Sequence, residues 1–249
     1  MLQLDVLQPD IMLGCGAGVS LQKVLEDNKL PAVSRLILAY LVARSFWQYY
    51  QSDWMRTNWD LRTIQFLPEE DTGDSDLAFN PCVPFLDLQT PDSLPTAPKE
   101  LEGKYGYIHK HPRILILGLL LFQICSELPY ETKISAQFSP ISVNQDCSYF
   151  HTSKKQGTWP ALDLNSYYVN AYKNIVAECF PAPYTSNFEG TLLDPKLDVP
   201  ARRALLRKKV VVPLHGLLKG MELFDQDDNI RPVALECKNQ SVDETGEFE

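Results

Sequence analysis

The segment Leu30–Trp54, LPAVSRLILAYLVARSFWQYYQSDW, is the longest apolar periodic stretch of this 249-residue chain. Pro31 suits the first turn of a helix, where the missing N–H of proline is not needed. The stretch is apolar on more than one face, so we expect a helix in the middle of the fold. Its apolar side chains recur at steps of three and four, the period of an α-helix: Val33, Leu36, Ile37, Tyr40, Ala43, Phe46, Trp47 and Tyr50.

A second apolar stretch, Ile114–Cys125, predicts a buried helix that follows Pro112 and ends before Pro129. It is much shorter than the roughly 20 apolar residues that a membrane span needs, so no membrane span is expected. Gly118 lies inside this helix, where glycine costs about 0.5–1 kcal/mol relative to alanine. Its presence predicts a close neighbour, which we expect to be the Leu30–Trp54 helix.

Helices dominate the rest of the chain as well. Ser20 can accept hydrogen bonds from a first helical turn, and Pro213 removes a backbone donor and should bend the helix that contains it. Residues 130–160 are polar without a clear period, and we expect an irregular segment there. The further helices are expected at 20–27, 163–179 and 200–223.

Strand patterns are few. Thr63–Leu67 alternates as a strand does, and a short strand at 83–88 interrupts a long proline-rich and acidic loop over 68–110. The predicted fold class is therefore mainly α, α+β through a few short strands. We expect one domain over 1–224, followed by an acidic, flexible tail at 225–249 that is too polar to offset the entropy of ordering.

The net charge of −9 is unevenly distributed. Residues 69–76 carry −5 and residues 225–249 carry −6, so the remainder carries +2. This nearly neutral body does not favour nucleic-acid binding, and an apolar content of 45% excludes a wholly disordered chain. The six cysteines show no paired spacing, which predicts reduced thiols and a cytoplasmic protein.

Two motifs could be mistaken for ligand sites. Gly14–Gly18 (GCGAG) lacks the lysine and hydroxyl residue that follow a phosphate-binding loop, so we interpret it as a turn. His109 and His111, with Cys82 or Cys125, could supply half of a zinc site, but structural zinc takes four ligands, usually as two close pairs. No second pair exists, and we expect solvated loop histidines and no metal.

A cluster of bases precedes the C-terminal apolar stretch. We interpret it as a solvated or acid-paired helix face. An anionic partner surface is the alternative, and nucleic-acid binding is not supported without interleaved aromatic residues. The bases are Arg202, Arg203, Arg207, Lys208 and Lys209.

Read in order, these segments resemble the C-terminal, helical lobe of the protein-kinase fold. Ser20–Leu25 is similar to the short helix after the kinase hinge, and Leu30–Trp54 to the long central helix. Thr63–Leu67 is similar to the strand after the catalytic loop. Pro112–Pro129, PRILILGLLLFQICSELP, is similar to the buried helix of that lobe.

Over about residues 18–224 the chain more closely resembles a fungal family of uncharacterised, kinase-derived domains. These domains often follow a prion-inhibition (HeLo-type) helical domain in cell-death and incompatibility proteins. The resemblance implies a non-catalytic interaction or signalling module with an unidentified protein partner, for which a HeLo-type helical-domain protein is the candidate. The shared features are Ala43–Tyr50 with Asp53 and Trp54, Trp59 with Ile64 and Phe66, Pro112–Leu121, Tyr172–Phe180 and Val211–Lys219.

The chain departs from the kinase pattern at the catalytic positions. Kinases need a glycine-rich loop, a strand lysine, a catalytic aspartate and magnesium ligands. Here RTNWD, ending at Asp60, stands at the catalytic-loop position, PFLD, ending at Asp87, is a poor match to DFG, and Arg113 replaces an aspartate. We therefore expect no cofactor and no ATP binding. If the protein is an enzyme, a divergent phosphotransferase or another activity on this scaffold, Asp60 and Asp87 are the candidate catalytic residues.

Overall fold

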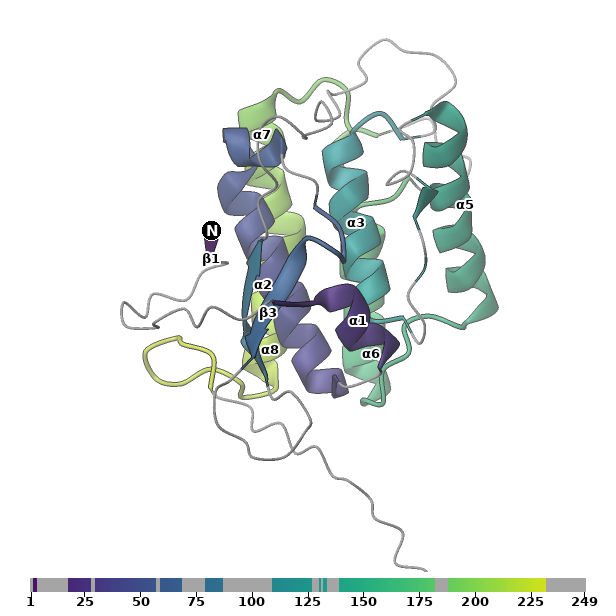
Figure 1. Cartoon of the computed structure of the whole chain (residues 1–249). Coiled ribbons are helices and arrows are strands. Elements are labelled where there is room, and N and C mark those ends of the chain that lie inside the picture. The colour runs from purple at the N-terminus through teal and green to yellow at the C-terminus, as the bar shows by residue number, and fades with distance from the viewer. Residues whose placement is uncertain are drawn as a thin grey trace, which may run out of the picture.

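The computed structural model describes residues 2–3, 18–27, 30–56, 59–68, 79–86, 109–126, 130, 132–133, 139–181 and 188–231. This part of the chain is mainly helical with a small antiparallel sheet, which confirms the predicted fold class (Figure 1). The helices are α1 (Leu21–Glu26), α2 (Ala32–Tyr49), the 3-10 turn η1 (Asp53–Arg56), α3 (Pro112–Ile124), α5 (Pro140–Gln156), α6 (Ser166–Ala177), α7 (Val199–Leu206), the π-helical η3 (Arg207–Val211) and α8 (Val212–Gly220). The strands are β1 (Leu2–Gln3), β2 (Val19–Ser20), β3 (Ile64–Pro68) and β4 (Phe79–Leu86).

The sheet has the order β1-β4-β3-β2, and every neighbouring pair is antiparallel. Strand β4 begins four residues before the predicted strand at 83–88, inside the segment expected to be a loop. Its prolines suggested a loop, because proline cannot donate to a strand ladder. The described part of β1 pairs only with Phe85 and Leu86, so Pro81 and Pro84 lie beyond that pairing.

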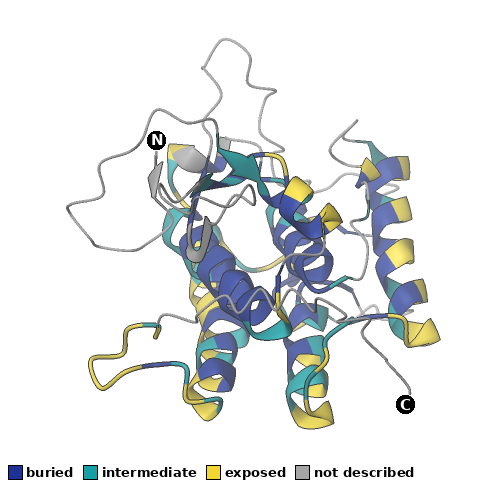
Figure 2. Ribbon diagram, turned by 60° about the horizontal axis from the view of Figure 1, so that its bottom comes forward, coloured by how far each residue is buried: buried dark blue, intermediate teal, exposed yellow. Residues whose placement is uncertain are grey.

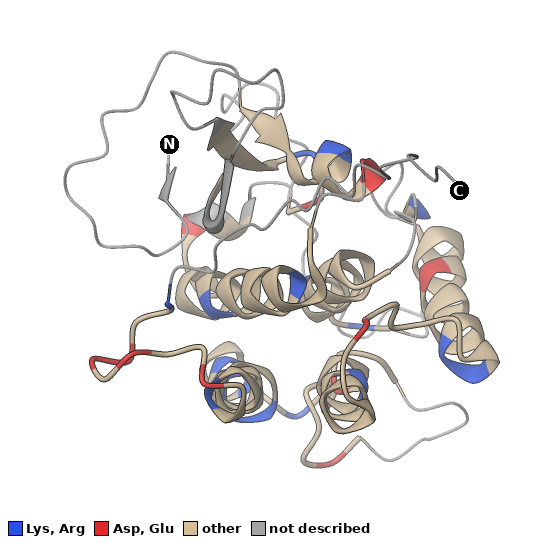
Figure 3. Ribbon diagram, turned by 90° about the horizontal axis from the view of Figure 1, so that it is seen from below, with Lys and Arg blue, Asp and Glu red and all other residues tan. Residues whose placement is uncertain are grey.

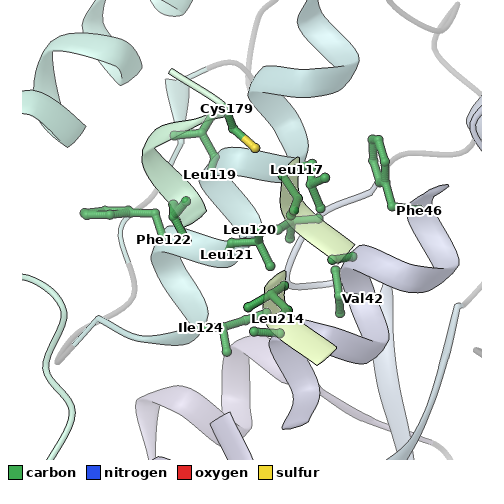
Figure 4. Close-up of a cluster of buried hydrophobic side chains, with 14 of the residues drawn as sticks. Val42, Phe46, Leu117, Leu119, Leu120, Leu121, Phe122, Ile124, Cys179 and Leu214 are labelled. Carbon is green, nitrogen blue, oxygen red and sulfur yellow. The ribbon is translucent and has the colours of Figure 1, made fainter. Parts of the chain in front are cut away.

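Helix α2 lies at the centre, as predicted, and none of its residues is exposed. Figure 4 shows Val42 and Phe46 of α2 beside Leu117 and Leu120 of α3, with Leu214 of α8 in the same cluster. Helix α2 also contacts β4 and η3. An apolar surface on several faces is what a helix in this position needs.

Arginine side chains hold the free carbonyl ends of two helices. Arg35 of α2 donates to Ser126 O at 2.6 Å and Ile124 O at 3.5 Å, at the end of α3. Arg203 of α7 donates to Trp47 O at 2.9 Å and Gln48 O at 3.3 Å, at the end of α2. The last carbonyl groups of a helix lack partners within it, so these contacts fix where α2 and α3 lie against their neighbours.

Gly118 is a packing glycine, as predicted, but its neighbour is not α2. A Cβ atom at Gly118 would lie 2.7 Å from the Cβ of Cys179 and 2.8 Å from Cε2 of Phe180. These two residues follow α6, so the missing side chain lets the end of α6 approach α3. The sequence analysis expected the longest apolar helix, α2, to be this close neighbour. Helix α2 packs instead on another side of α3 (Figure 4).

Helix α5 contradicts the prediction of an irregular segment at 130–160. Its N-terminus has a capping box formed by Ser139 and Ser142, with Pro140 in the first turn, and it ends at Gly157 in the left-handed region (φ 72°). The apolar stripe is narrow, because the buried large side chains are only Val143, Cys147 and Phe150. Figure 2 shows α5 buried on the side that faces the body and exposed on the outer side.

The predicted C-terminal helix forms as α7, η3 and α8 in direct succession. The α-helical hydrogen-bond pattern is interrupted just before Pro213, where residues 207–211 are π-helical. Pro213 has no N–H to donate to an earlier carbonyl group, and a wider π-type turn accommodates such a break in the hydrogen-bond ladder. The sequence predicted a bend at Pro213. The irregular turn lies at residues 207–211, before the proline.

Gly216 gives a test of the α8 assignment. A Cβ atom at this exposed position would meet nothing within 4 Å. Because glycine inside a helix costs about 0.5–1 kcal/mol relative to alanine, we expect Gly216→Ala to raise the free energy of unfolding by that amount in urea denaturation. A loss of stability in this variant would contradict the helical, exposed placement of Gly216.

Candidate functional site

An open groove of about 650 Å³ lies between the outer face of α5 and the residues that precede it. Helix α5 supplies six of the described lining residues, and the preceding segment supplies two. These residues are Tyr130, Lys133, Ile141, Asn144, Gln145, Ser148, Tyr149 and Thr152.

A tyrosine stack forms one wall of the groove. The rings of Tyr130 and Tyr149 lie parallel, with their centroids 3.8 Å apart and an interplanar angle of 9°. Tyr130 donates its hydroxyl to Oδ1 of Asp146 at 2.9 Å, and the backbone N–H of Lys133 donates to the same oxygen at 2.9 Å. Burial raises the pKa of Tyr130, and the hydrogen bond to Asp146 raises it further. Tyr130 therefore stays a neutral donor, and the buried Asp146 anchors this wall to α5.

The groove presents apolar, hydroxyl and amide side chains and the amine of Lys133. Ile141 is 70% exposed and Tyr149 is 41% exposed. Among the described residues that line the groove, none carries a carboxylate, an imidazole or a thiol. Exposed apolar and aromatic side chains such as these are typical of binding surfaces.

Of the two candidate catalytic aspartates, Asp60 lies among the described residues. The Asp60 carboxylate accepts the backbone N–H groups of Arg62 at 2.8 Å and Thr63 at 3.0 Å, so it stabilises its own turn before β3. This is the ordinary local role of an aspartate in a turn. Asp87 lies outside the described residues.

His109 and His111 are buried, and the prediction of solvated histidines is wrong. Each is 1% exposed. His109 donates from Nε2 to the carbonyl oxygen of Cys179 at 2.9 Å, and its Nδ1 accepts the backbone N–H of His111 at 3.2 Å. The histidines thus join the segment before α3 to the end of α6. The side chain of Cys82 lies outside the described residues, which include no group of three potential metal ligands.

The buried thiols do not supply a nucleophile. Burial raises the pKa of Cys125 to about 12 and that of Cys147 to about 12. Burial also raises the pKa of Cys179. A thiol is a poor nucleophile until it ionises, so these cysteines serve as apolar core residues.

The predicted basic face is divided between buried and exposed side chains. Arg202 is fully buried, and its guanidinium donates to Leu192 O at 3.2 Å and Asp194 O at 3.0 Å. Arg203 and Arg207 lie over the ring of Trp47, at 5.0 and 5.3 Å from its centroid. Lys208 and Arg207 are exposed, and Lys209 pairs with Glu178 at 3.6 Å. A uniformly solvated face is therefore wrong for Arg202 and Arg203.

The glycine-rich motif leads into the sheet. Gly14–Ala17 lie outside the described residues, and Gly18 immediately precedes β2. A Cβ atom at Gly18 would lie 2.8 Å from Cζ of Phe85, so the glycine permits close packing against β4.

Comparison with known proteins places most of the chain in one family model. Residues 17–220 match the model described as a domain of unknown function, DUF7580. No curated protein and no solved structure matches the chain. Among the described helices, none combines the length and apolar character that a membrane crossing requires.

Proposed function

The chain belongs to the DUF7580 family of domains of unknown function, and from that starting point we propose that it is a non-catalytic protein-interaction and signalling module. The observation that carries the proposal is the α5 groove, where Ile141 and Tyr149 are exposed among polar side chains, of which only Lys133 is charged in the described lining. Apolar and aromatic side chains that are exposed in the free protein are typical anchors of a protein interface.

The charge in the groove indicates the chemistry of the partner segment. Lys133 is the charged side chain among the described lining residues. A complementary segment would place an acidic side chain beside Lys133 and an apolar side chain against Ile141 and Tyr149. Charge pairs at the rim of an interface orient the partner, while the apolar contacts contribute most of the affinity.

The sequence resemblance extends the proposal to lineage and partner. The elements α1, α2, β3 and α3 follow one another in the order that the kinase C-terminal lobe would have, which supports a kinase-derived, pseudokinase-like module of fungal type. The partner in this proposal is a HeLo-type helical-domain protein in the cytoplasm, because the resembling domains often accompany such helical domains.

Capture from an extract of the source organism tests the proposal. The tagged chain serves as bait in three forms: wild type, Ile141→Asp and Tyr167→Asp. Tyr167 is 72% exposed on α6 and does not line the groove, so it is a matched control. We expect the wild type and the Tyr167 variant to retain the same protein, and the Ile141 variant to lose it at least several-fold. Equal capture by all three forms would refute the groove as the binding site.

ATP binding tests the rival reading, a divergent phosphotransferase. We expect no change in melting temperature at 1 mM ATP with magnesium. A Kd near 10 μM would stabilise the protein by about 2.7 kcal/mol under these conditions, which is several degrees for a domain of this size. A saturable shift that Asp60→Asn abolishes would make the enzyme reading the leading one.

A further inference from the structure

A partly exposed stripe runs along the outer face of η3 and α8. Lys208, Val212, His215 and Lys219 follow one another at steps of four, three and four, which places them on one side of a helix. Val212 is 52% exposed, one of the few large apolar side chains at the described surface, and the Lys219 side chain is 66% exposed. We call these four residues the basic stripe.

The lower half of the basic stripe, formed by His215 and Lys219, already binds an acidic side chain of the same chain. Lys208 and Val212 form its upper half. Asp228, in the turn after α8, accepts a hydrogen bond from Nε2 of His215 at 3.2 Å and lies 3.3 Å from Nζ of Lys219. Figure 3 shows red acidic segments in the loop that follows α8 and blue segments on the helix itself. Although desolvation opposes it, the hydrogen bond from Lys219 and the nearby His215 lower the pKa of Asp228.

The turn that carries Asp228 is held in place by its own hydrogen bonds. Oδ1 of Asp225 accepts the backbone N–H groups of Asp227 at 2.9 Å and Asn229 at 2.8 Å. The N–H of Arg231 donates to Leu223 O at 2.9 Å, beside the bridge between Phe224 and Ile230. The chain therefore reaches residue 231 at the lower end of the stripe.

The upper half of the stripe is available for binding. Lys208 is exposed, and within the described ranges it forms no ion pair. Gly216, beside Val212 on the helix surface, leaves open space where a Cβ atom would be. A cation, an exposed valine and a bare helix backbone at one place form a surface that an acidic and apolar segment fits.

We propose that residues 232–249 bind along the upper half of the basic stripe and continue the contact that Asp228 begins. This segment carries five carboxylates against one lysine, and Val242 precedes Asp243 and Glu244 as the apolar residue that would lie on Val212. The carboxylates of Asp243 and Glu244 then pair with Lys208.

The segment is long enough for this contact. Lys208 lies 12 residues before Gly220, where α8 ends, which is about 18 Å at a rise of roughly 1.5 Å per residue. Asp243 is 12 residues beyond Arg231, and an extended chain of that length spans about 40 Å. A tether this short gives the acidic segment an effective concentration in roughly the millimolar range, so weak pairs can hold it without a second protein.

The bound segment would make the stripe a regulated surface, distinct from the α5 groove. While residues 232–249 occupy it, an acidic partner must compete with a tethered ligand. Because exposed charge pairs are screened by salt, the contact should weaken as ionic strength rises.

Carbodiimide cross-linking of the full chain tests this inference. The reagent joins a lysine amine to a carboxylate in contact, with loss of water and no spacer, and mass spectrometry locates the bonds. Lys219–Asp228 is the internal positive control in every sample, since these groups are 3.3 Å apart. We expect links from Lys208 to carboxylates within 243–249 in the monomer, and several-fold lower yield in 0.5 M NaCl.

Two variants separate the stripe from the rest of the surface. Val212→Asp places a negative charge in the middle of the stripe, where it repels the carboxylates of residues 243–249. This variant should lower the yield of Lys208 links several-fold. Tyr167→Asp adds the same charge on α6 and should leave the yield unchanged. The proposal is overturned if Lys219–Asp228 links form without Lys208 links, if 243–249 link equally to Lys154 and Lys155 of α5, or if the links join two copies.

Discussion

Replacing Arg202 with methionine should lower the free energy of unfolding by about 3 kcal/mol. The guanidinium is fully buried and donates to the carbonyl oxygens of Leu192 and Asp194. Methionine fills much of the space of the side chain but leaves both acceptors buried without a donor. Each unsatisfied buried group costs about 1–3 kcal/mol, and release of the buried charge offsets part of this sum.

Urea denaturation of the full chain measures this loss, and Arg203→Met is the matched control. Arg203 makes the same kind of contact, to Trp47 O and Gln48 O, but is only partly buried, so water can replace its donors and we expect a loss of about 1 kcal/mol. Arg202→Lys should be intermediate, because an ammonium group lacks the planar fork that reaches two acceptors. If Arg202→Met stays within 1 kcal/mol of the wild type, the two carbonyl groups have other donors.

Replacing Gly118 with leucine should prevent stable folding. Even a Cβ atom would lie 2.7 Å from the Cβ of Cys179, an atom attached to the backbone that no rotamer change can move. Added core methylene groups typically cost about 1–3 kcal/mol, and leucine adds three further carbon atoms. A loss above roughly 3 kcal/mol is large against the 5–15 kcal/mol by which domains are stable.

Circular dichroism and urea denaturation distinguish the possible outcomes. Gly118→Ala should fold with a loss of about 1–3 kcal/mol. Gly216→Leu makes the same replacement at an exposed helical glycine with open space around it, and it should leave the fold intact. Adding Cys179→Gly to Gly118→Ala removes one of the two facing Cβ atoms, so the double variant should lose less than the sum of the single losses. A fully folded Gly118→Leu variant would show that α3 and the end of α6 can separate.

The elements that could be predicted from the sequence are those with wide apolar surfaces. Helices α2 and α3 have buried side chains on several faces, so they appear in the sequence as long apolar stretches. Helix α5 buries a narrow stripe around Val143 and Phe150, so its period was hidden by polar residues. The signal that could have revealed it lies at its ends, Ser139-Pro140 and Gly157, which are typical helix-boundary residues.

Polar residues were misjudged where their partners are distant in sequence. His109 bonds to a carbonyl group 70 residues away, and Arg203 to one 156 residues away. The sequence analysis did not predict the groove, because it did not predict α5. Nothing in the sequence shows that Tyr149 stacks on Tyr130 to form a wall of the groove. The boundaries of the domain and tail stay predictions, although residues 225–231 form an ordered turn.

The arginine side chains that bind carbonyl groups at the ends of α2 and α3 should make the helical body tolerant of acid. A surface carboxylate in general loses its ion pairs once it is protonated, near or below about pH 4. A guanidinium keeps its proton throughout the range in which proteins fold, and a peptide carbonyl has none to gain. The bonds of Arg35 and Arg203 to backbone oxygens at the ends of α3 and α2 therefore persist in acid that abolishes surface ion pairs. Acidification should loosen the charged periphery before it releases the ends of these helices.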